Sequence, residues 1–156
     1  INPVAFLQSL PGFTMMVVAK MGSASGVRPI TCTDTDGMKI YYDGTNWNTK
    51  IASGQGTSTV TGDTTKFHIY TLVFDGTQTG NANRLKFRYD GTDQTMTYTG
   101  TVGTVTNATS TTFYVGQDTA SNFFNGDIGE MLMFTRTLNT NELLATEAYL
   151  KYHWAL

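Results

Sequence analysis

Hydrophobic and polar residues alternate with a period of two over several stretches of the chain, which is the pattern of half-buried β-strands. In residues 84–89 three apolar side chains alternate with three basic ones, namely Leu85, Phe87 and Tyr89 against Arg84, Lys86 and Arg88. Residues 94–99 alternate in the same way after an Asp-Gly turn, so we expect them to pair with residues 84–89. The pattern predicts a hairpin with one buried face and one cationic outer face.

Two other runs are apolar almost throughout. Residues 13–20 and 67–74 consist mainly of aliphatic and aromatic side chains, as expected of strands that are covered on both faces. Dipeptides of the Asp-Gly or Asn-Gly type, which favour tight hairpin turns, begin at Asp36, Asp43, Asp75, Asp90 and Asn125. Residues 38–42 and 47–51 flank one of these turns, and they predict a second hairpin.

The pattern becomes helical near the C-terminus. Asn139, followed three residues later by Glu142, predicts a capping box, and we expect one short helix from Asn139 onward. Glu147 interrupts the apolar stripe of this helix. We interpret Glu147 as an edge position or as one half of a structural ion pair, for which Arg136 is a candidate partner.

The composition indicates one folded domain of low charge. The chain has 156 residues, of which 29 are threonine and 14% are charged, against about 25% charged residues in an average globular protein. An apolar fraction of 40% and a formal net charge of −2 exclude a disordered chain. Threonine suits a pleated surface and keeps it soluble without charge. We expect residues 1–156 to form a single domain that is part of a longer chain.

The low charge also excludes two classes of partner. Acidic residues outnumber lysine and arginine by 12 to 10, so the basic surface of a nucleic-acid-binding protein is not expected. No apolar run approaches the roughly 18 residues that would span a bilayer. The single cysteine, Cys32, has no partner for an intramolecular disulfide.

A set of spaced residues near the C-terminus carries a family resemblance. The set comprises Phe124, Gly126, Ile128, Glu130, Arg136, Leu138, Glu142, Glu147, Tyr149, Leu150 and Trp154. Its spacing resembles the C-terminal signature of laminin G-like domains in the concanavalin A-like lectin/glucanase superfamily. The resemblance implies an all-β fold, namely a two-sheet antiparallel β-sandwich (jelly roll) with one short C-terminal α-helix.

The resemblance also bears on the N-terminal side of the domain. Domains of this family usually carry one or two further strands before the point that corresponds to Ile1. We expect that those strands lie on another segment, that the sandwich is trimmed, or that a partner chain completes an open sheet edge. The last alternative implies a homo-oligomer or an assembly with another protein.

The carboxylates do not support catalysis. Glucanases of this fold use a tight cluster of acidic residues on one strand, with the acid and the nucleophile about 5–5.5 Å apart. Here Glu130 stands between Gly129 and Met131. The sequence contains no Gly-x-Ser-x-Gly nucleophile motif for which His68 or His153 could act as the base, and we interpret both histidines as structural. We therefore expect no enzyme, with a degenerate glycosidase that retains activity as a remaining alternative.

Aromatic rings and amides around residues 38–51 are the candidates for a sugar site. Sugars are held by aromatic faces and by hydrogen bonds from amide side chains. The candidate carbohydrate-binding residues are Tyr41, Tyr42, Asn46, Trp47 and Asn48. In the alternative, Trp47 and one of the two tyrosines point into the core.

Two further sets of charged residues are candidates for ligand contact. Arg84, Lys86 and Arg88 form a face that suits an anionic glycan or an acidic protein surface, or else a solvated strand face that discourages aggregation. By resemblance to calcium-binding relatives, Asp118 and Asp127 are candidate calcium ligands. The alternative is that Asp118 ends a strand and Asp127 is solvated.

These observations predict a non-catalytic carbohydrate-binding or adhesion module of an extracellular, cell-surface or virion protein. Its expected partner is a glycan or another protein surface, without nucleic acid or membrane insertion, and calcium is the cofactor considered. The alternative is a purely structural fibre or capsid-decoration domain that packs against copies of itself or another chain. The two functions differ in the exposure that they require of Trp47, because glycan binding at the predicted hairpin needs an exposed indole.

Overall fold

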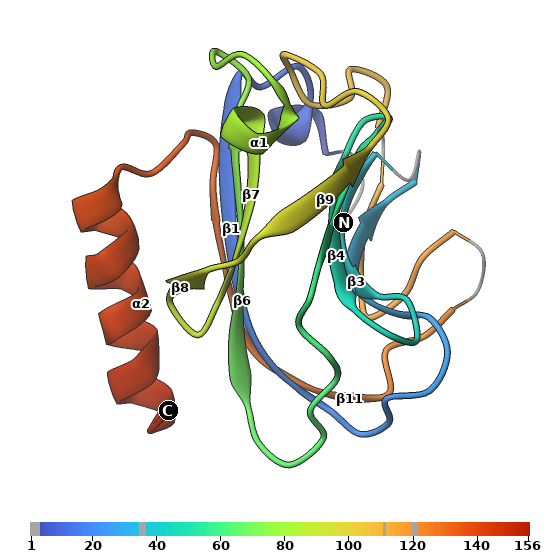
Figure 1. Cartoon of the computed structure of the whole chain (residues 1–156), viewed down its shortest axis with the longest axis vertical. Helices are drawn as coiled ribbons and strands as arrows, with labels where there is room; N and C mark the ends of the chain where they lie inside the picture. The colour runs from blue at the N-terminus through green and yellow to red at the C-terminus, as the bar shows by residue number, and fades with distance from the viewer. Residues whose placement is uncertain (1–3, 35–36, 111, 120–121) are drawn as a thin grey trace.

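The chain folds into two facing antiparallel sheets, with a helix outside one of them (Figure 1). The computed structural model describes residues 4–34, 37–110, 112–119 and 122–156. Within these ranges the five-stranded sheet has the order β11 (Gly126–Phe134), β1 (Gly12–Met21), β6 (His68–Asp75), β7 (Leu85–Tyr89) and β8 (Thr92–Asp93). The six-stranded sheet has the order β10 (Phe113–Val115), β2 (Arg28–Thr33), β3 (Met38–Tyr42), β4 (Trp47–Ile51), β5 (Gly54–Ser58) and β9 (Met96–Thr99). The predicted antiparallel sandwich is confirmed.

The two strands predicted to be covered on both faces lie in the middle of the five-stranded sheet. In β1, Met15 and Val17 point into the apolar interior between the sheets. Met16 and Val18 point to the other side, where they pack in a second apolar cluster with Leu143 and other residues of the C-terminal region. All four side chains are fully buried, so this continuously apolar run has a covering layer on each face.

The hairpin predicted between residues 84–89 and 94–99 is replaced by a shorter one, in which β7 pairs with Thr92 and Asp93 of β8. The Asp90–Gly91 turn has the two positive φ values, 50° and 80°, that a tight hairpin turn needs. After β8, however, β9 crosses to the six-stranded sheet and pairs with β5. Apart from one backbone hydrogen bond from Gln94 to Phe87, the prediction that residues 94–99 pair with β7 is therefore wrong. The crossing segment lies over the open side of the sandwich in Figure 1.

Helix α2 (Thr140–Trp154) begins at the predicted cap. The Asn139 side chain accepts hydrogen bonds from the backbone N–H of Asn141 and Glu142, and Glu142 accepts one in return from the backbone of Asn139, so the capping box is confirmed. The two other helical segments are the short η1 (Ala5–Leu7) and α1 (Asn81–Arg84). Among the described residues, no helix is both long enough and apolar enough to cross a membrane.

Residues of the C-terminal signature hold α2 against the sheet. Glu130 on β11 accepts hydrogen bonds from the Trp154 indole at 2.9 Å and from the Tyr149 hydroxyl at 3.2 Å. The Trp154 ring lies so close to Gly129 that a Cβ at this position would come within 2.3 Å of it. Glycine at 129 therefore permits the contact between helix and strand.

The two ion pairs of the helix differ from the predicted one. Arg136 binds Glu142 at 2.7 Å in a pair that lies largely in solvent. Glu147 is buried and binds Arg88 of β7 at 2.8 Å. The structural ion pair predicted for Glu147 exists, but its partner is Arg88 of β7 rather than Arg136.

Candidate functional site

The predicted sugar-binding hairpin is formed by β3 and β4, and its two largest aromatic residues face inward. Trp47 is fully buried between the sheets, with its ring centroid 4.2 Å from that of Tyr70 and 5.6 Å from that of Tyr42. Tyr42 is also buried. The expected exposure of Trp47 is wrong, and the alternative with Trp47 and one tyrosine in the core is confirmed. Strand alternation explains the result. Tyr42 and Trp47 lie opposite each other on the paired strands β3 and β4, so their side chains point to the same face of the sheet.

The side chain of Asn48 on the opposite face is occupied by structural hydrogen bonds. Its amide donates to Asp43 Oδ2 at 2.9 Å and to the carbonyl of Asn46 at 2.8 Å, and its oxygen accepts from Gln55 and Thr57. Asn48 is fully buried, so it ties the turn to β5 and is not available to a sugar.

The remaining two hairpin candidates are partly accessible. Tyr41 and Asn46 are half-buried. The ammonium group of Lys39 lies 4.6 Å from the centroid of the Tyr41 ring, in a cation–π geometry. Carbohydrate contact by Tyr41 and Asn46 stays a prediction.

The two candidate calcium ligands have different surroundings. Asp118 is buried, pairs with Lys39 at 3.0 Å and accepts two hydrogen bonds from Asn122. Burial alone would raise the pKa of Asp118, but the hydrogen bonds from Asn122 and Lys39 outweigh it and lower that pKa. Asp127 is exposed on β11. In the part of the chain that the structure describes, no three His, Cys, Asp or Glu side chains gather as a metal site, so calcium binding stays a prediction.

The three basic residues predicted to form one cationic face separate in the structure. Arg84 ends α1 and donates to the carbonyl oxygens of Gln78 and Val102, at 2.7 and 2.9 Å. Arg88 is buried, and Lys86 is exposed. A continuous cationic surface is therefore absent here, and the prediction of such a surface is wrong.

Arg88 instead forms a buried network between β7 and α2. Its guanidinium donates to both oxygens of Glu147, at 2.8 and 2.9 Å, to Asp93 at 2.6 Å and to the carbonyl of Gly91. Glu147 also accepts a hydrogen bond from Thr71 at 3.3 Å. The hydrogen bonds from Arg88 to Glu147 are the main reason that the pKa of Arg88 is raised. This network fixes the distance between the helix and the β7–β8 hairpin.

A cavity of about 580 Å³ lies next to this network, between the first turn of α2 and the outer face of β6 and β7. Its apolar lining consists of Val73, Leu138 and Leu143. Its polar lining consists of Asp75, Gln78, Asn83, Lys86, Arg88, Asp93, Thr137, Asn139 and Thr140. An apolar floor with hydrogen-bonding side chains around it is typical of small-molecule sites.

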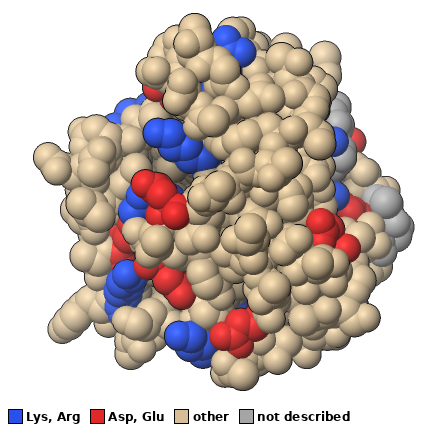
Figure 2. Space-filling view, in the orientation of Figure 1, with Lys and Arg blue, Asp and Glu red and all other residues tan. Residues whose placement is uncertain are grey.

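Two smaller cavities adjoin the first one. A cavity of about 320 Å³ shares Lys86 and Asp93 with it and continues toward Tyr98. A cavity of about 220 Å³ shares Asp75 and Thr137 with it and continues toward Pro11. We call this row of three cavities the helix groove. Figure 2 shows basic and acidic side chains gathered on the side where α2 stands, while most of the same face carries no charge.

The charges along the helix groove balance one another. Hydrogen bonds from Thr77 lower the pKa of Asp75, and the nearby Lys86 contributes in the same direction. Asp93 binds Arg88 through one oxygen, and its side chain is 71% exposed. The groove therefore presents both hydrogen-bond donors and charged acceptors without a large net charge.

Two residues of this groove, Lys86 and Arg88, were predicted ligand contacts, though as part of a cationic face. Asp75, Asn83, Asp93 and the residues before α2 were not predicted as site residues. Asp75 was assigned to a turn because it precedes glycine, and that assignment is compatible with lining a cavity. Only the position of α2 beside β7, set by the Arg88–Glu147 pair, brings these separate segments together. The alternation of β7 was the one available signal, since it placed Lys86 on the outer face.

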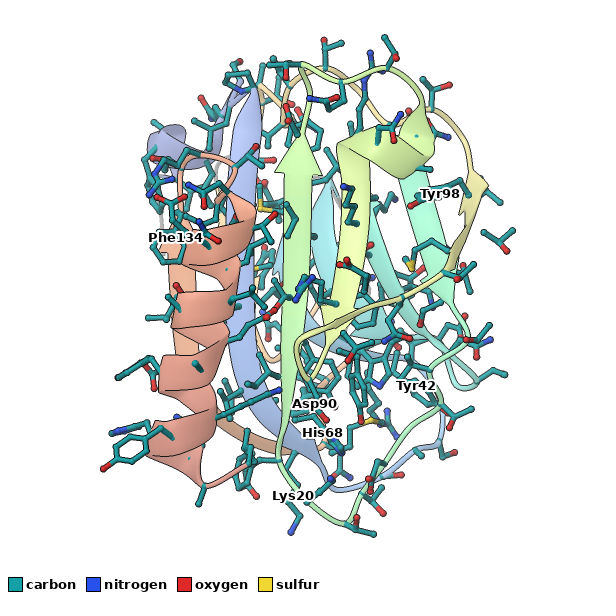
Figure 3. The ribbon with its side chains drawn as sticks, turned by 60° about the vertical axis from the view of Figure 1, so that its left-hand side comes forward. Lys20, Tyr42, His68, Asp90, Tyr98 and Phe134 are labelled. Atoms are coloured by element: carbon teal, nitrogen blue, oxygen red, sulfur yellow. The ribbon has the colours of Figure 1, made fainter. Side chains whose placement is uncertain are left out.

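A second cluster of ionisable groups lies at the lower end of β6. His68 is buried and its two ring nitrogens lie 2.7 Å from Asp90 and 3.0 Å from Asp63 (Figure 3). Burial alone would lower the pKa of His68, but the hydrogen bonds to the two aspartates outweigh it and raise that pKa. The structural role predicted for this histidine agrees with these contacts.

The carboxylates of these two clusters are separated by basic groups. His68 stands between Asp63 and Asp90, and Arg88 stands between Asp93 and Glu147. Neither arrangement leaves the open gap between two carboxyl groups in which a glycosidic bond is cleaved.

Comparison with known families and structures identifies proteins that share this fold. The model of a family described as "Concanavalin A-like lectin/glucanases superfamily" matches residues 4–144. A comparison with curated proteins finds no significant match. Several solved structures share the fold at low sequence identity.

Three of these structures illustrate the range. A proposed carbohydrate-binding protein from Bacteroides ovatus is 14% identical, with a TM-score of 0.72 over 92% of this chain and 42% of its own. The Ruminococcus gnavus IT-sialidase CBM40, bound to alpha2,3 sialyllactose, is 13% identical, with a TM-score of 0.62 over 89% and 83%. Trypanosoma rangeli sialidase is 15% identical, with a TM-score of 0.60 over 91% and 23%. This chain thus spans about two fifths of the first protein and about a quarter of the last.

Proposed function

This chain belongs to the concanavalin A-like lectin/glucanase superfamily, and on that basis we propose that it is a non-catalytic carbohydrate-binding module. The observation that carries the proposal is the helix groove, in which hydrogen-bonding side chains surround an apolar floor. Two proteins of the same fold are described as carbohydrate-binding or as bound to a sialylated sugar, which supports the same class of ligand. The separation of the carboxylates by basic groups supports a binding role rather than hydrolysis.

In this proposal the groove recognises hydroxyl groups at its rim. Lys86 donates hydrogen bonds, whereas the exposed Asp93 and the ionised Asp75 accept them. The aliphatic side chains of the floor contact the C–H faces of the sugar, and the polar residues that make up most of the lining bind its hydroxyl groups. The Arg88–Glu147 pair and the capping box hold both walls in place, so little ordering is required on binding.

The test is a glycan array followed by titration calorimetry with the best glycan. Lys86→Ala removes a charged donor from the rim, and we expect it to weaken binding about tenfold, since a hydrogen bond from a charged group contributes roughly 1.5–3 kcal/mol. Lys66→Ala is the matched control because Lys66 is an exposed lysine outside the groove lining. An array without any signal, or equal loss in both variants, would overturn the proposal.

We extend the proposal to location and context: the module belongs to a larger extracellular, cell-surface or virion protein and serves adhesion. The experiment is to locate the full-length protein with an antibody in intact and permeabilised cells or on purified virions. Labelling that requires permeabilisation would contradict the extracellular assignment.

A second candidate function is protein–protein assembly, and two exposed apolar side chains of α2 favour it. Leu144 and Tyr152 are 52% and 91% exposed, and large exposed apolar side chains mark interaction surfaces. If assembly is the function, the full-length protein forms a stable oligomer by light scattering, and Tyr152→Ser with Leu144→Ser dissociates it. A monomer at all concentrations would remove this candidate.

A further inference from the structure

The helix groove does not end beside α2 but continues onto the open side of the sandwich. Lys86 and Asp93 line both the largest cavity and the next one, which extends to Phe87, Met96 and Tyr98. The second cavity exists because β9 leaves the five-stranded sheet after β8 and crosses to β5. It therefore lies between the edge strands of the two sheets.

The far end of this second cavity differs chemically from the first. Its lining is mainly apolar and includes the ring of Tyr98, which Figure 3 shows at the upper edge of the sandwich, away from His68 and Asp90. The Tyr98 hydroxyl donates to the carbonyl of Leu85 at 2.6 Å, so the ring is held in one orientation. A fixed aromatic ring beside an aliphatic side chain is suited to the C–H face of a sugar.

The row of cavities is as large as the biggest small-molecule sites. The cavities have volumes of about 580, 320 and 220 Å³, and small-molecule sites as a whole measure roughly 300–1,000 Å³. Lys86 and Asp93 lie where the first and second cavities meet, and Asp75 lies where the first and third meet. The two arginines of the lining, Arg88 and Arg136, are paired with Glu147 and Glu142. This balance disfavours a polyanion, which requires unpaired positive charge along its length.

We propose that the helix groove binds an extended, uncharged oligosaccharide, with successive sugar rings in successive cavities and one ring against Tyr98. The inference rests on the proposed carbohydrate-binding function and adds the class and the length of the ligand. Lys86 and Asp93 bind the hydroxyl groups of the chain at the junction between the first and second cavities. Tyr98 and Met96 then select for chains long enough to pass that junction.

The experiment is a chain-length series measured by titration calorimetry. The probes are cello-, xylo-, malto- and laminari-oligosaccharides from disaccharide to hexasaccharide, with a heparin hexasaccharide as the polyanionic comparison. For the series that binds, we expect affinity to rise about tenfold or more between the disaccharide and the hexasaccharide. The heparin hexasaccharide is expected to bind more weakly than the neutral one.

Variants then locate the additional affinity. Tyr98→Ala is expected to weaken hexasaccharide binding about tenfold and to leave disaccharide binding unchanged, because only the longer chain reaches the ring. Tyr98→Phe keeps the ring and is expected to retain binding. Ala82→Trp fills the second cavity from an exposed position on α1, so it tests the same point without removing packing.

The outcomes separate this inference from the proposed function. Equal affinity for short and long chains, or full hexasaccharide affinity in both Tyr98→Ala and Ala82→Trp, overturns the inference while carbohydrate binding stands. Tighter binding of heparin than of every neutral chain overturns the assignment of an uncharged ligand. Failure of every sugar to bind overturns the proposed function itself.

Discussion

The β3–β4 hairpin and the strand β7 had equal standing as predicted ligand surfaces, but the structure uses them in opposite ways. In the hairpin, Trp47 and Tyr42 became part of the core. In β7, Lys86 became part of a groove wall while Arg88, two residues away on the same face, was buried against α2. The residue type therefore did not decide the role; the layer that covers each face did.

Neighbouring residues of the same type make this point most clearly. Tyr41 and Tyr42 are adjacent, yet alternation places Tyr41 toward the outside and Tyr42 inside. Lys86 and Arg88 share a face, yet the helix covers one of them only. The first difference follows from strand geometry, whereas the second depends on where a distant helix docks.

The largest expected effect concerns the hairpin. Trp47→Ala removes a fully buried ring that contacts Tyr70, and we expect it to lower the free energy of unfolding by about 3–5 kcal/mol. Tyr41→Ala, at the position next to Tyr42 but on the outer face, is expected to cost about 1 kcal/mol, mainly the cation–π contact with Lys39. Urea unfolding of both variants measures the difference. Similar costs would contradict the assignment of Trp47 to the core.

The next effect compares the two basic residues of β7. Arg88→Ala leaves Glu147 buried without its partner, and we expect the free energy of unfolding to fall by about 3 kcal/mol. This value is the lower limit for breaking a buried ion pair, because the second partner of Arg88, Asp93, is open to solvent and tolerates the loss. Lys86→Ala is expected to change stability by less than about 0.5 kcal/mol. Thermal and urea unfolding test both.

A double variant sharpens the same comparison. Replacing both partners of the buried pair, in Arg88→Met with Glu147→Leu, removes the unpaired charge, so we expect it to recover most of the stability lost in Arg88→Ala. A double variant that is no more stable than Arg88→Ala would contradict the explanation by an uncompensated buried charge.

The smallest effect is a pH dependence at His68, next to the end of β7. Asp63 comes from the segment after β5, and Asp90 comes from the turn after β7. Because the pKa of His68 is raised in the folded protein, its contribution to stability is complete below the ordinary pKa of about 6.5 and is lost as the pH rises through the folded value. A neutral imidazole donates from one nitrogen only, so one aspartate then loses its donor.

His68→Gln tests this pH dependence. We expect the difference in unfolding free energy between the unmodified protein and the variant to be about 2 kcal/mol near pH 5 and to shrink toward pH 8. Below about pH 4 the difference also falls, because Asp63 must be ionised to pair with His68. Hydrogen bonds with Thr65 are the main reason that the pKa of Asp63 is lowered to about 2, so this loss continues down to that pH. His153→Gln, at an exposed position, is the control. A pH-independent difference would show that His68 acts through packing alone.

Much of the local structure was predictable because short-range chemistry decides it. The capping box at Asn139 depends on residues three positions apart, and the Asp90–Gly91 turn depends on two adjacent φ angles. Strand β1 was predicted as doubly covered because its apolar run has no polar face. In contrast, the partner of Glu147 and the crossing of β9 involve contacts between segments far apart in the sequence, for which the local pattern carries no information.

The sequence by itself therefore determined most of the strands, the turns, and the C-terminal helix with its cap. It also lacks the tight cluster of carboxylates on one strand that hydrolysis on this fold requires. The tertiary structure decided which face of each strand is covered, and with it the position of the candidate site. The physical reason is that a period of two divides a strand into two faces but does not say what lies against either. Helix α2, held by Arg88 and Trp154, covers part of the five-stranded sheet and leaves the groove beside it.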